Sequence, residues 1–507
     1  MTVPPSPDRG TRAALLLVAI LAALQLAAAC IGSFRADDWI NLEHGRWALS
    51  SAGRLAVWTR LNPFTLYRPL VDYWHGLMLA LFGLRPAPML VVLIGMLAAQ
   101  SWMLARLARA RGAGRPGSAL AAAAVWVQPN AYSWTTLWVS NVTGSLVTTA
   151  SLAVLLLHHH VVRRGGRGRT AWPGLVAAVV VFVAGALCKE DIVVLPAALA
   201  ALEIARWRWL TPAERRAAVT SWLVLVVTAV LYAVFRTQVV PTPQSGGQRY
   251  HLALGPHVVA NLRFFALHLA ALPAFVAAIA LVTWPAVFRR ASWSDEPRRR
   301  ALADALGAFA WAALALLLYL PIRGRPAYGY LYAPSFGIAY AVARLLALAP
   351  ATAGLRARPA VFALALHAAI ATLLTGAALF AVRWHEYGTI VRDAFAELDR
   401  DLPSPPRGAR LLVLDTQGSE TFAGRSLYSL VFDGAAASMV RLHYNRPDLD
   451  VVEHWDVDAG GREVLPAGVV MAFRTRRGRL ERIGPPGVEP PPASVPAPGE
   501  AARGPGR

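Results

Sequence analysis

Long stretches without a single Asp, Glu, Lys or Arg constrain this chain more than any other feature of its sequence. The longest covers residues 116–162, which is enough for two crossings of a bilayer, because one helical crossing needs about 20 apolar residues. Only 16% of the 507 residues are charged, whereas soluble domains carry about a quarter. The sequence therefore predicts an all-α protein that crosses the membrane many times.

The apolar runs predict eleven membrane spans joined by short loops. The strongly basic loops then all lie on one side of the membrane, as the positive-inside rule requires. With residues 1–12 in the cytoplasm, the odd number of spans places the C-terminus outside. The predicted spans are residues 13–34, 87–105, 117–133, 142–158, 171–188, 192–205, 217–235, 265–288, 302–321, 332–350 and 360–382.

The first outer loop, residues 35–86, contains one ambiguous apolar stretch at 71–84. Counting it as a span would move every later basic loop to the outside. Because Asp72 and His75 interrupt it, we predict an interfacial amphipathic helix instead.

The chain leaves the predicted membrane domain, residues 13–382, before a final region of different composition. Residues 383–483 combine a helical stretch with strand-like runs such as Leu411–Leu414 and Val469–Phe473. We expect them to form a small extracytoplasmic α+β domain. Residues 484–507 are rich in proline and are predicted to be a disordered tail.

The net charge of +21 does not indicate a nucleic-acid partner, because the basic residues gather in short loops between apolar runs. Of the 50 Lys and Arg residues, all but one are Arg. The cysteines, Cys30 and Cys188, are too few for a disulfide framework.

An acidic pair, Asp37 and Asp38, stands just beyond the first predicted span. Adjacent carboxylates at a membrane boundary can act as a general base or hold a divalent cation, the one cofactor that the residues suggest. Equally, an Asp before a helical stretch can serve as its N-cap. The pair alone leaves both interpretations open.

The single lysine, Lys189, opens the charged turn Lys189-Glu190-Asp191 between two predicted spans. A solvated turn also needs polar residues. Three consecutive charges in apolar sequence, and a lysine where the chain otherwise uses arginine, favour a functional turn, and a compact ammonium suits a phosphate oxygen.

A second outer loop contains Arg323 and Arg325, followed by tyrosines that include Tyr330. Arginine forks bind phosphate with two hydrogen bonds. An aromatic belt with arginines that reach to the interface is an equally good interpretation.

Four further segments accompany the acid pair in a recognisable order. They are YRPL at 67–70, LFGL at 81–84, CKEDIVVLP at 188–196 and RPAYGYLYAPSFG at 325–337. This order resembles the GT-C superfamily of membrane glycosyltransferases, especially its protein O-mannosyltransferase-like and lipid A aminoarabinose transferase-like branches. The resemblance covers roughly residues 12–382, and Asp38 stands where those branches commonly have Glu.

The resemblance implies an enzyme of the bacterial plasma (inner) membrane that moves a sugar from a polyprenyl-phosphate carrier to a lipid, glycan or protein acceptor outside. It implies catalytic roles for Asp37 and Asp38. Lys189, Arg323 and Arg325 are expected to bind the donor phosphate. The supporting residues are Glu190, Tyr330 and Arg68.

Three other classes of membrane protein compete with this interpretation. A transporter or flippase of lipid-linked sugars predicts charges deep within spans. An O-antigen ligase or polymerase favours a large outer loop late in the chain. A non-catalytic assembly protein would use the C-terminal domain as its interaction module.

Overall fold

Helices dominate the computed structural model of the chain, which divides into two units. The first comprises Met1–Gly32 and His44–Trp384 and is called the membrane unit here; the second comprises Ser33–Glu43 and His385–Arg507 and is called the C-terminal unit. The structure describes residues 9–34, 37–61, 66–126, 136–239, 254–269, 296–322, 328–346, 385–386, 388–414, 421–422, 425–426, 435–452, 456–457, 463–464, 469–476 and 479–483.

The membrane unit is built from the predicted apolar runs, several of which begin with a proline in the first helical turn, where its missing N–H costs nothing. Among the described residues, four helical stretches are long and apolar enough to cross a membrane: Pro86–Ala110, Val139–Gly165, Pro212–Gln238 and Glu296–Leu317. The main helices are α1 (Arg9–Cys30), α5 (Pro86–Ala110), α6 (Arg115–Trp126), α7 (Val142–Gly165), α8 (Trp172–Cys188), α9 (Leu195–Ile204), α10 (Pro212–Val239), α11 (Pro256–Leu269), α13 (Glu296–Leu317) and α14 (Tyr332–Leu346).

Several predicted spans extend beyond the described residues, and the last, residues 360–382, lies entirely outside them. The number eleven therefore stays a prediction.

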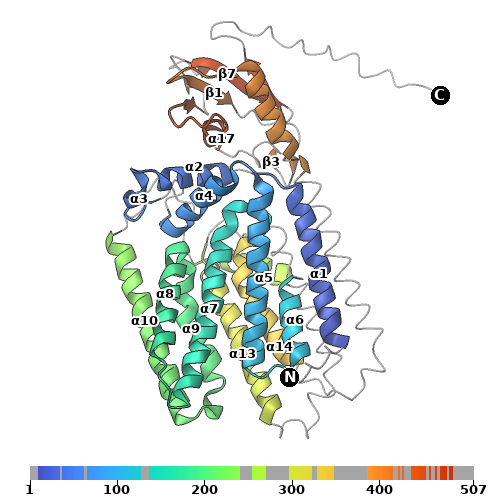
Figure 1. The fold of residues 1–507 in the computed structure, drawn as a ribbon, viewed down its shortest axis with the longest axis vertical. Coiled ribbons are helices and arrows are strands. Elements are labelled where there is room, and N and C mark those ends of the chain that lie inside the picture. The colour runs from blue at the N-terminus through green and yellow to red at the C-terminus, as the bar shows by residue number, and fades with distance from the viewer. Residues whose placement is uncertain are drawn as a thin grey trace, which may run out of the picture. The chain divides into compact units, whose positions relative to one another are not determined.

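Helix α7 lies at the centre of this unit and packs against α5, α8 and α10, while α13 packs against α9 and α14. Figure 1 shows α5, α7 and α8 with roughly aligned axes and α10 tilted beside them. Large apolar side chains such as Leu223, Val227 and Leu231 are exposed along α10. A long apolar helix with an exposed apolar face is what a protein surrounded by lipid requires, because its backbone bonds are satisfied internally.

Two helices of the predicted first outer loop cross at a pair of glycines. These are α2 (Asp37–Leu49) and α4 (Pro69–Phe82), and the short helix α3 (Gly53–Ala56) lies between them in sequence. A Cβ atom on Gly45 would lie 2.3 Å from the backbone nitrogen of Gly76, so the two backbones touch directly.

Helix α4 is the predicted interfacial helix, and its polar side chains point into the protein. Asp72 and His75 are 2% and 0% exposed, whereas Leu77 and Leu81 are 47% and 62% exposed. The Asp72 carboxylate lies 3.5 Å from the His44 ring on α2. The polar face of this amphipathic helix therefore serves internal contacts and leaves the apolar face outside.

The C-terminal unit contains a four-stranded sheet in the order β4-β1-β7-β8. Its first strand pairs in parallel with β4 and β7, and β7 pairs antiparallel with β8. Apolar side chains such as Leu411, Val413 and Phe473 are buried in it. The strands are β1 (Arg410–Leu414), β4 (Asp450–Val452), β7 (Val469–Arg476) and β8 (Arg479–Ile483), and the short pairs are β2 (Thr421–Phe422) with β3 (Arg425–Ser426) and β5 (Asp456–Val457) with β6 (Glu463–Val464).

Both predicted strand runs, at Leu411–Leu414 and Val469–Phe473, are found in this sheet. The unit also contains a helical stretch at 388–401 and helix α17 (Ala436–His443). Sequence patterns did not indicate that Ser33–Glu43, the segment with the acid pair, belongs to this unit. The predicted tail, residues 484–507, lies outside the described residues.

Candidate functional site

The acid pair forms the first turn of α2. Helix α2 begins at Asp37, so both carboxylates lie within the helix rather than before it. The N-terminal end of a helix carries a partial positive charge, which favours negative side chains in this turn. Asp38 is fully buried, whereas Asp37 is partly exposed. Of the two, Asp37 is therefore the carboxylate that an incoming molecule can reach.

The lysine turn follows directly from the end of α8. The helix ends at Cys188, Lys189 has an extended backbone, and a 3-10 turn, η3 (Glu190–Val194), leads into α9. The ammonium of Lys189 donates to the Tyr319 hydroxyl oxygen at 2.9 Å and forms an ion pair with Asp191. The Tyr319 hydroxyl in turn donates to Asp191.

Two stacked tyrosine rings lie beside this ammonium. The rings of Tyr319 and Tyr330 are 4.1 Å apart and nearly parallel. The Lys189 nitrogen lies 5.1 Å from the centre of the first ring and 5.6 Å from that of the second. Cations within about 6 Å of an aromatic ring are attracted to its face. Tyr330 lies in the 3-10 turn η6 (Tyr328–Leu331), directly before α14.

The neighbouring Glu190 points to a different partner, Arg68. The guanidinium of Arg68 lies 3.1 Å from the Glu190 carboxylate, and their side chains are 13% and 45% exposed. Partial burial alone would raise the pKa of Glu190, but the positive charges of Arg68 and Lys189 outweigh it and hold this pKa well below its usual range. Glu190 is therefore ionised at every physiological pH.

A further arginine, Arg236, stands near this group. Its guanidinium lies 5.7 Å from the centre of the Tyr67 ring, and Tyr67 directly precedes Arg68. No carboxylate pairs with Arg236 in the part of the chain that the structure describes. Sequence reasoning missed it, although an arginine at the predicted outer end of a span runs against the positive-inside distribution and could have drawn attention.

We call these residues the Lys189 cluster: Arg68, Lys189, Glu190, Asp191, Arg236, Tyr319 and Tyr330. The structure thus brings together Lys189, Glu190, Arg68 and Tyr330, which were predicted to act at one site. Asp191 and Tyr319 were not on that list, because their role depends on a contact between segments about 130 residues apart. Arg323 and Arg325 lie outside the described residues, in the segment between Ile322 and Tyr328.

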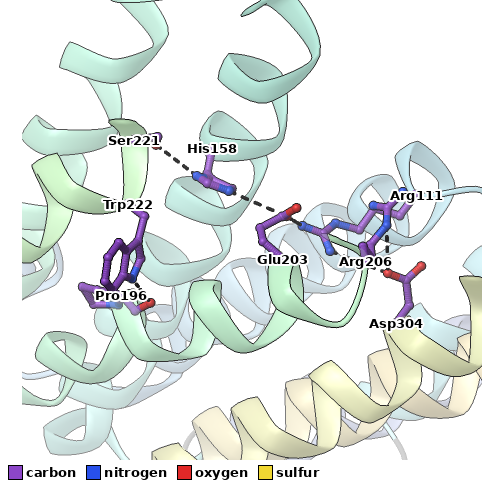
Figure 2. Close-up of polar contacts among 8 residues, drawn as sticks. All are labelled: Arg111, His158, Pro196, Glu203, Arg206, Ser221, Trp222 and Asp304. Atoms are coloured by element: carbon purple, nitrogen blue, oxygen red, sulfur yellow. Dashed lines mark hydrogen bonds and ion pairs between the residues drawn. The ribbon is translucent and has the colours of Figure 1, made fainter. Parts of the chain in front are cut away.

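A second group of buried charges surrounds Asp304 (Figure 2). Asp304 is fully buried and lies 2.9 Å from Arg344 and 3.3 Å from Arg206. Arg111 reaches both Asp304, at 3.7 Å, and Glu203, to which it forms a close ion pair. Glu203 also lies 3.6 Å from His158, whose other ring nitrogen contacts Ser221 at 3.0 Å.

This Asp304 cluster ties several helices together at the end of α9 opposite the lysine turn. Glu203 is the penultimate residue of α9, and Arg111 and Arg206 come just after α5 and α9. These three charges thus stand at or just beyond helix ends, whereas Asp304 lies within α13. The other, N-terminal end of α9 is braced by Trp222 of α10, which donates to the Pro196 carbonyl at 2.9 Å (Figure 2).

A metal centre is not apparent in the described ranges. Within them, no group of three or more His, Cys, Asp or Glu side chains is arranged to hold a metal ion. The acid pair offers two carboxylates on one helical turn and remains the one predicted place for a divalent cation.

No protein-family model and no curated protein matches the sequence. Among solved structures, the chain is similar to ArnT from Cupriavidus metallidurans bound to undecaprenyl phosphate, with a TM-score of 0.46 and 16% identity, over 91% of this chain and 92% of ArnT. It is also similar to the mycobacterial arabinofuranosyltransferase AftD, with a TM-score of 0.48 and 15% identity, over 89% of this chain and 32% of AftD.

The oligosaccharyltransferase of Archaeoglobus fulgidus is a third similar structure, with a TM-score of 0.45 and 12% identity, over 87% of this chain and 64% of that protein.

Proposed function

We propose that this protein is a membrane glycosyltransferase that moves a sugar from a polyprenyl-phosphate carrier to an acceptor on the extracytoplasmic side of a bacterial inner membrane. The observation that carries the proposal is the Lys189 cluster. The only lysine of the chain is held by Asp191 and Tyr319 in a turn between apolar helices. A phosphate attached to a lipid tail must be bound at such a place, because the tail cannot leave the bilayer.

The geometry leaves Lys189 able to bind an anion. An ammonium has three N–H donors. Tyr319 and Asp191 engage two of them and fix the direction of the third. Because Asp191 balances its charge and Glu190 balances that of Arg68, the surplus positive charge must come from Arg236 and, in this proposal, from Arg323 and Arg325.

The chemical step follows from these roles. A hydroxyl oxygen of the acceptor attacks the anomeric carbon of the sugar, and its proton passes to the carboxylate of Asp37. The bond between the anomeric carbon and the phosphate oxygen breaks, and its electron pair stays on that oxygen, which gives polyprenyl phosphate. The cations that bind the phosphate therefore stabilise a charge that grows in the transition state. Asp38, the second carboxylate of the acid pair, is buried and lies directly next to this base in the sequence.

The test uses purified protein in nanodiscs with undecaprenyl-phosphate-linked sugars as donors and a bacterial membrane extract as the source of acceptor. Release of undecaprenyl phosphate is followed by mass spectrometry. We expect the Asp37→Asn/Asp38→Asn variant to lose activity about a hundredfold or more, as loss of a general base costs. Asn has nearly the same size and shape as Asp, so the variant loses the two carboxylate charges and little else, at a cost of about 0.3–1 kcal/mol for each charge in the first helical turn.

A binding measurement separates the donor site from the acceptor. Lys189→Ala should weaken the binding of undecaprenyl phosphate, whereas Arg164→Ala, which removes an exposed cation from the last turn of α7, should not. Lys189→Arg should restore binding only in part, because a guanidinium is larger and directs its donors differently. Full activity of the double Asn variant would refute the proposal. Passage of intact donor across proteoliposome membranes without sugar transfer would indicate a transporter instead.

A further inference from the structure

Helix α2 is held in its second turn by side chains from the far end of the chain. Glu43 accepts two bonds from the guanidinium of Arg441 on α17, at 2.5 Å to Nε and 3.1 Å to Nη2. The same carboxylate accepts a third bond from the Ser438 hydroxyl at 2.6 Å. Arginine forks that bind a carboxylate with two bonds impose geometry as well as contributing energy.

An aromatic contact holds the same face of the helix one turn earlier. Trp39 is fully buried and meets Phe34 edge-on at 5.0 Å and Phe395 at 5.8 Å. Phe395 stacks on the ring of His443, which follows Arg441 by two residues. Trp39 and Glu43 are four residues apart and therefore lie on one side of α2.

These two anchors leave the start of α2 little freedom. Asp38 and Asp37 directly precede Trp39, so the apolar anchor sits within one helical turn of both carboxylates. A helix fixed at two points along one face can neither slide nor rotate about its axis. The directions of the two acid side chains are thereby set by α17 and by residues 388–401.

We infer that the part of the C-terminal unit that begins at His385 positions the acid pair, and that Arg441 and Ser438 are positioning residues for the transfer reaction. The inference rests on the proposed function, in which Asp37 is the base. It assigns the C-terminal unit a part in catalysis instead of a role as an interaction module. In this inference, Arg441 and Ser438 touch neither donor nor acceptor and act only through Glu43.

The experiment compares turnover with donor binding in the purified full-length protein. Arg441→Ala should lower kcat between about tenfold and a hundredfold, since a displacement of about 1 Å in a catalytic group can cost that much. The affinity for undecaprenyl phosphate, measured separately, should stay within twofold of the wild type, because the Lys189 cluster belongs to the other unit. Arg441→Lys should recover activity only in part.

Two further variants show that the pair, and not the fold in general, is responsible. The exchange Glu43→Arg/Arg441→Glu should restore a large part of the kcat that each single exchange loses. Arg410→Ala removes another arginine–carboxylate contact of the same unit, with Asp450 in the sheet, and should leave kcat unchanged. If Arg441→Ala fails to fold, Glu43→Gln, which has the same shape without the charge, takes its place.

The possible failures are distinguishable. Wild-type kcat in both Arg441→Ala and Glu43→Gln, with an inactive Asp37→Asn/Asp38→Asn variant, would overturn the positioning role and leave the proposed function standing. Equal losses of kcat and of undecaprenyl phosphate binding in Arg441→Ala would also overturn it, because they would show a general disturbance. Activity of the double Asn variant would refute the proposed base itself.

Discussion

The ammonium nitrogen of Lys189 lies 2.9 Å from the hydroxyl oxygen of Tyr319, a residue 130 positions later in the chain. The same hydroxyl donates to Asp191, so it connects the ammonium to the carboxylate that balances it. Tyr319 therefore acts on Lys189 in two ways, through its hydroxyl and through the face of its ring.

Removing only the hydroxyl should separate these contributions. Tyr319→Phe keeps the stacked rings but loses the hydrogen bonds to Lys189 and Asp191. A hydrogen bond to a charged group is worth about 1.5–3 kcal/mol, so we expect donor affinity to fall by about tenfold or more. Titration of the purified variant with undecaprenyl phosphate measures this affinity. Tyr73→Phe, which loses a hydrogen bond to the Arg54 carbonyl, is the matched control and should bind normally.

The Asp304 cluster predicts a large effect on stability. Asp304→Asn removes the negative charge that faces Arg206 and Arg344, and leaves their guanidinium groups buried without compensation. Breaking a buried ion pair in this way costs about 3–5 kcal/mol. Glu296→Gln, on the same helix, removes an exposed pair with Arg300 and should cost less than about 1 kcal/mol. Thermal unfolding in detergent compares the two variants.

The crossing of α2 and α4 allows no side chain at its centre. Gly45→Ala or Gly76→Ala should force the helices apart and destabilise the protein by about 1–3 kcal/mol, the usual cost of overpacking. Gly95→Ala in α5 has open space around its Cβ and should be neutral or stabilising, since Ala favours helix. A fall in the melting temperature of the Gly95 variant equal to that of the other two would contradict this explanation.

His75 predicts a dependence of stability on pH. Burial lowers the pKa of this ring to about 4, with the Asp72 carboxylate opposing the shift. Between the ordinary pKa of about 6.5 and about 4, the unfolded state therefore binds more protons than the folded state. The melting temperature should fall as pH drops through this window, and His75→Gln should make that decline shallower. His160→Gln, a change at an exposed ring, should leave the decline of the melting temperature with falling pH unchanged.

The predicted topology can be tested with fusions. Alkaline phosphatase is active only outside the cytoplasm, so a fusion at residue 400 should be active and one after Arg164 inactive. The basis is the clustering of arginines in the predicted inner loops. The opposite result would reverse the predicted orientation and move the Lys189 cluster to the cytoplasmic side.

Local sequence predicted the helices well because apolar runs have few alternatives in a membrane. The runs containing α5, α7, α10 and α13 all form long helices. It also indicated the charged turn at Lys189, since three charges in apolar sequence are rare. It could not indicate Tyr319, which ends an apolar run like many interfacial tyrosines and acquires its role only from the packing of α13 beside the turn.

The Asp304 cluster shows a second limit to what could be predicted from the sequence. In the sequence, Glu203 and Asp304 are acids inside apolar regions, whereas Arg111, Arg206 and Arg344 cannot be told apart from the many arginines that set orientation. Which arginine turns inward depends on the ends of helices far apart in sequence. The association of Ser33–Glu43 with the C-terminal unit could not be predicted for the same reason. The sequence around Trp39 and Glu43 gives no indication that their partners are Phe395 and Arg441.

The division of the C-terminal unit into two distant stretches has a consequence for biosynthesis. Glu43 leaves the ribosome roughly 340 residues before the segment that begins at His385, which at about 5–20 residues per second is a delay on the order of 20–70 s. During that time the nascent chain carries the acid pair without the side chains that hold it. A chain that terminates early therefore enters the membrane with its first turn of α2 unassembled, and on the proposed mechanism such a fragment would be inert towards the lipid-linked sugars around it.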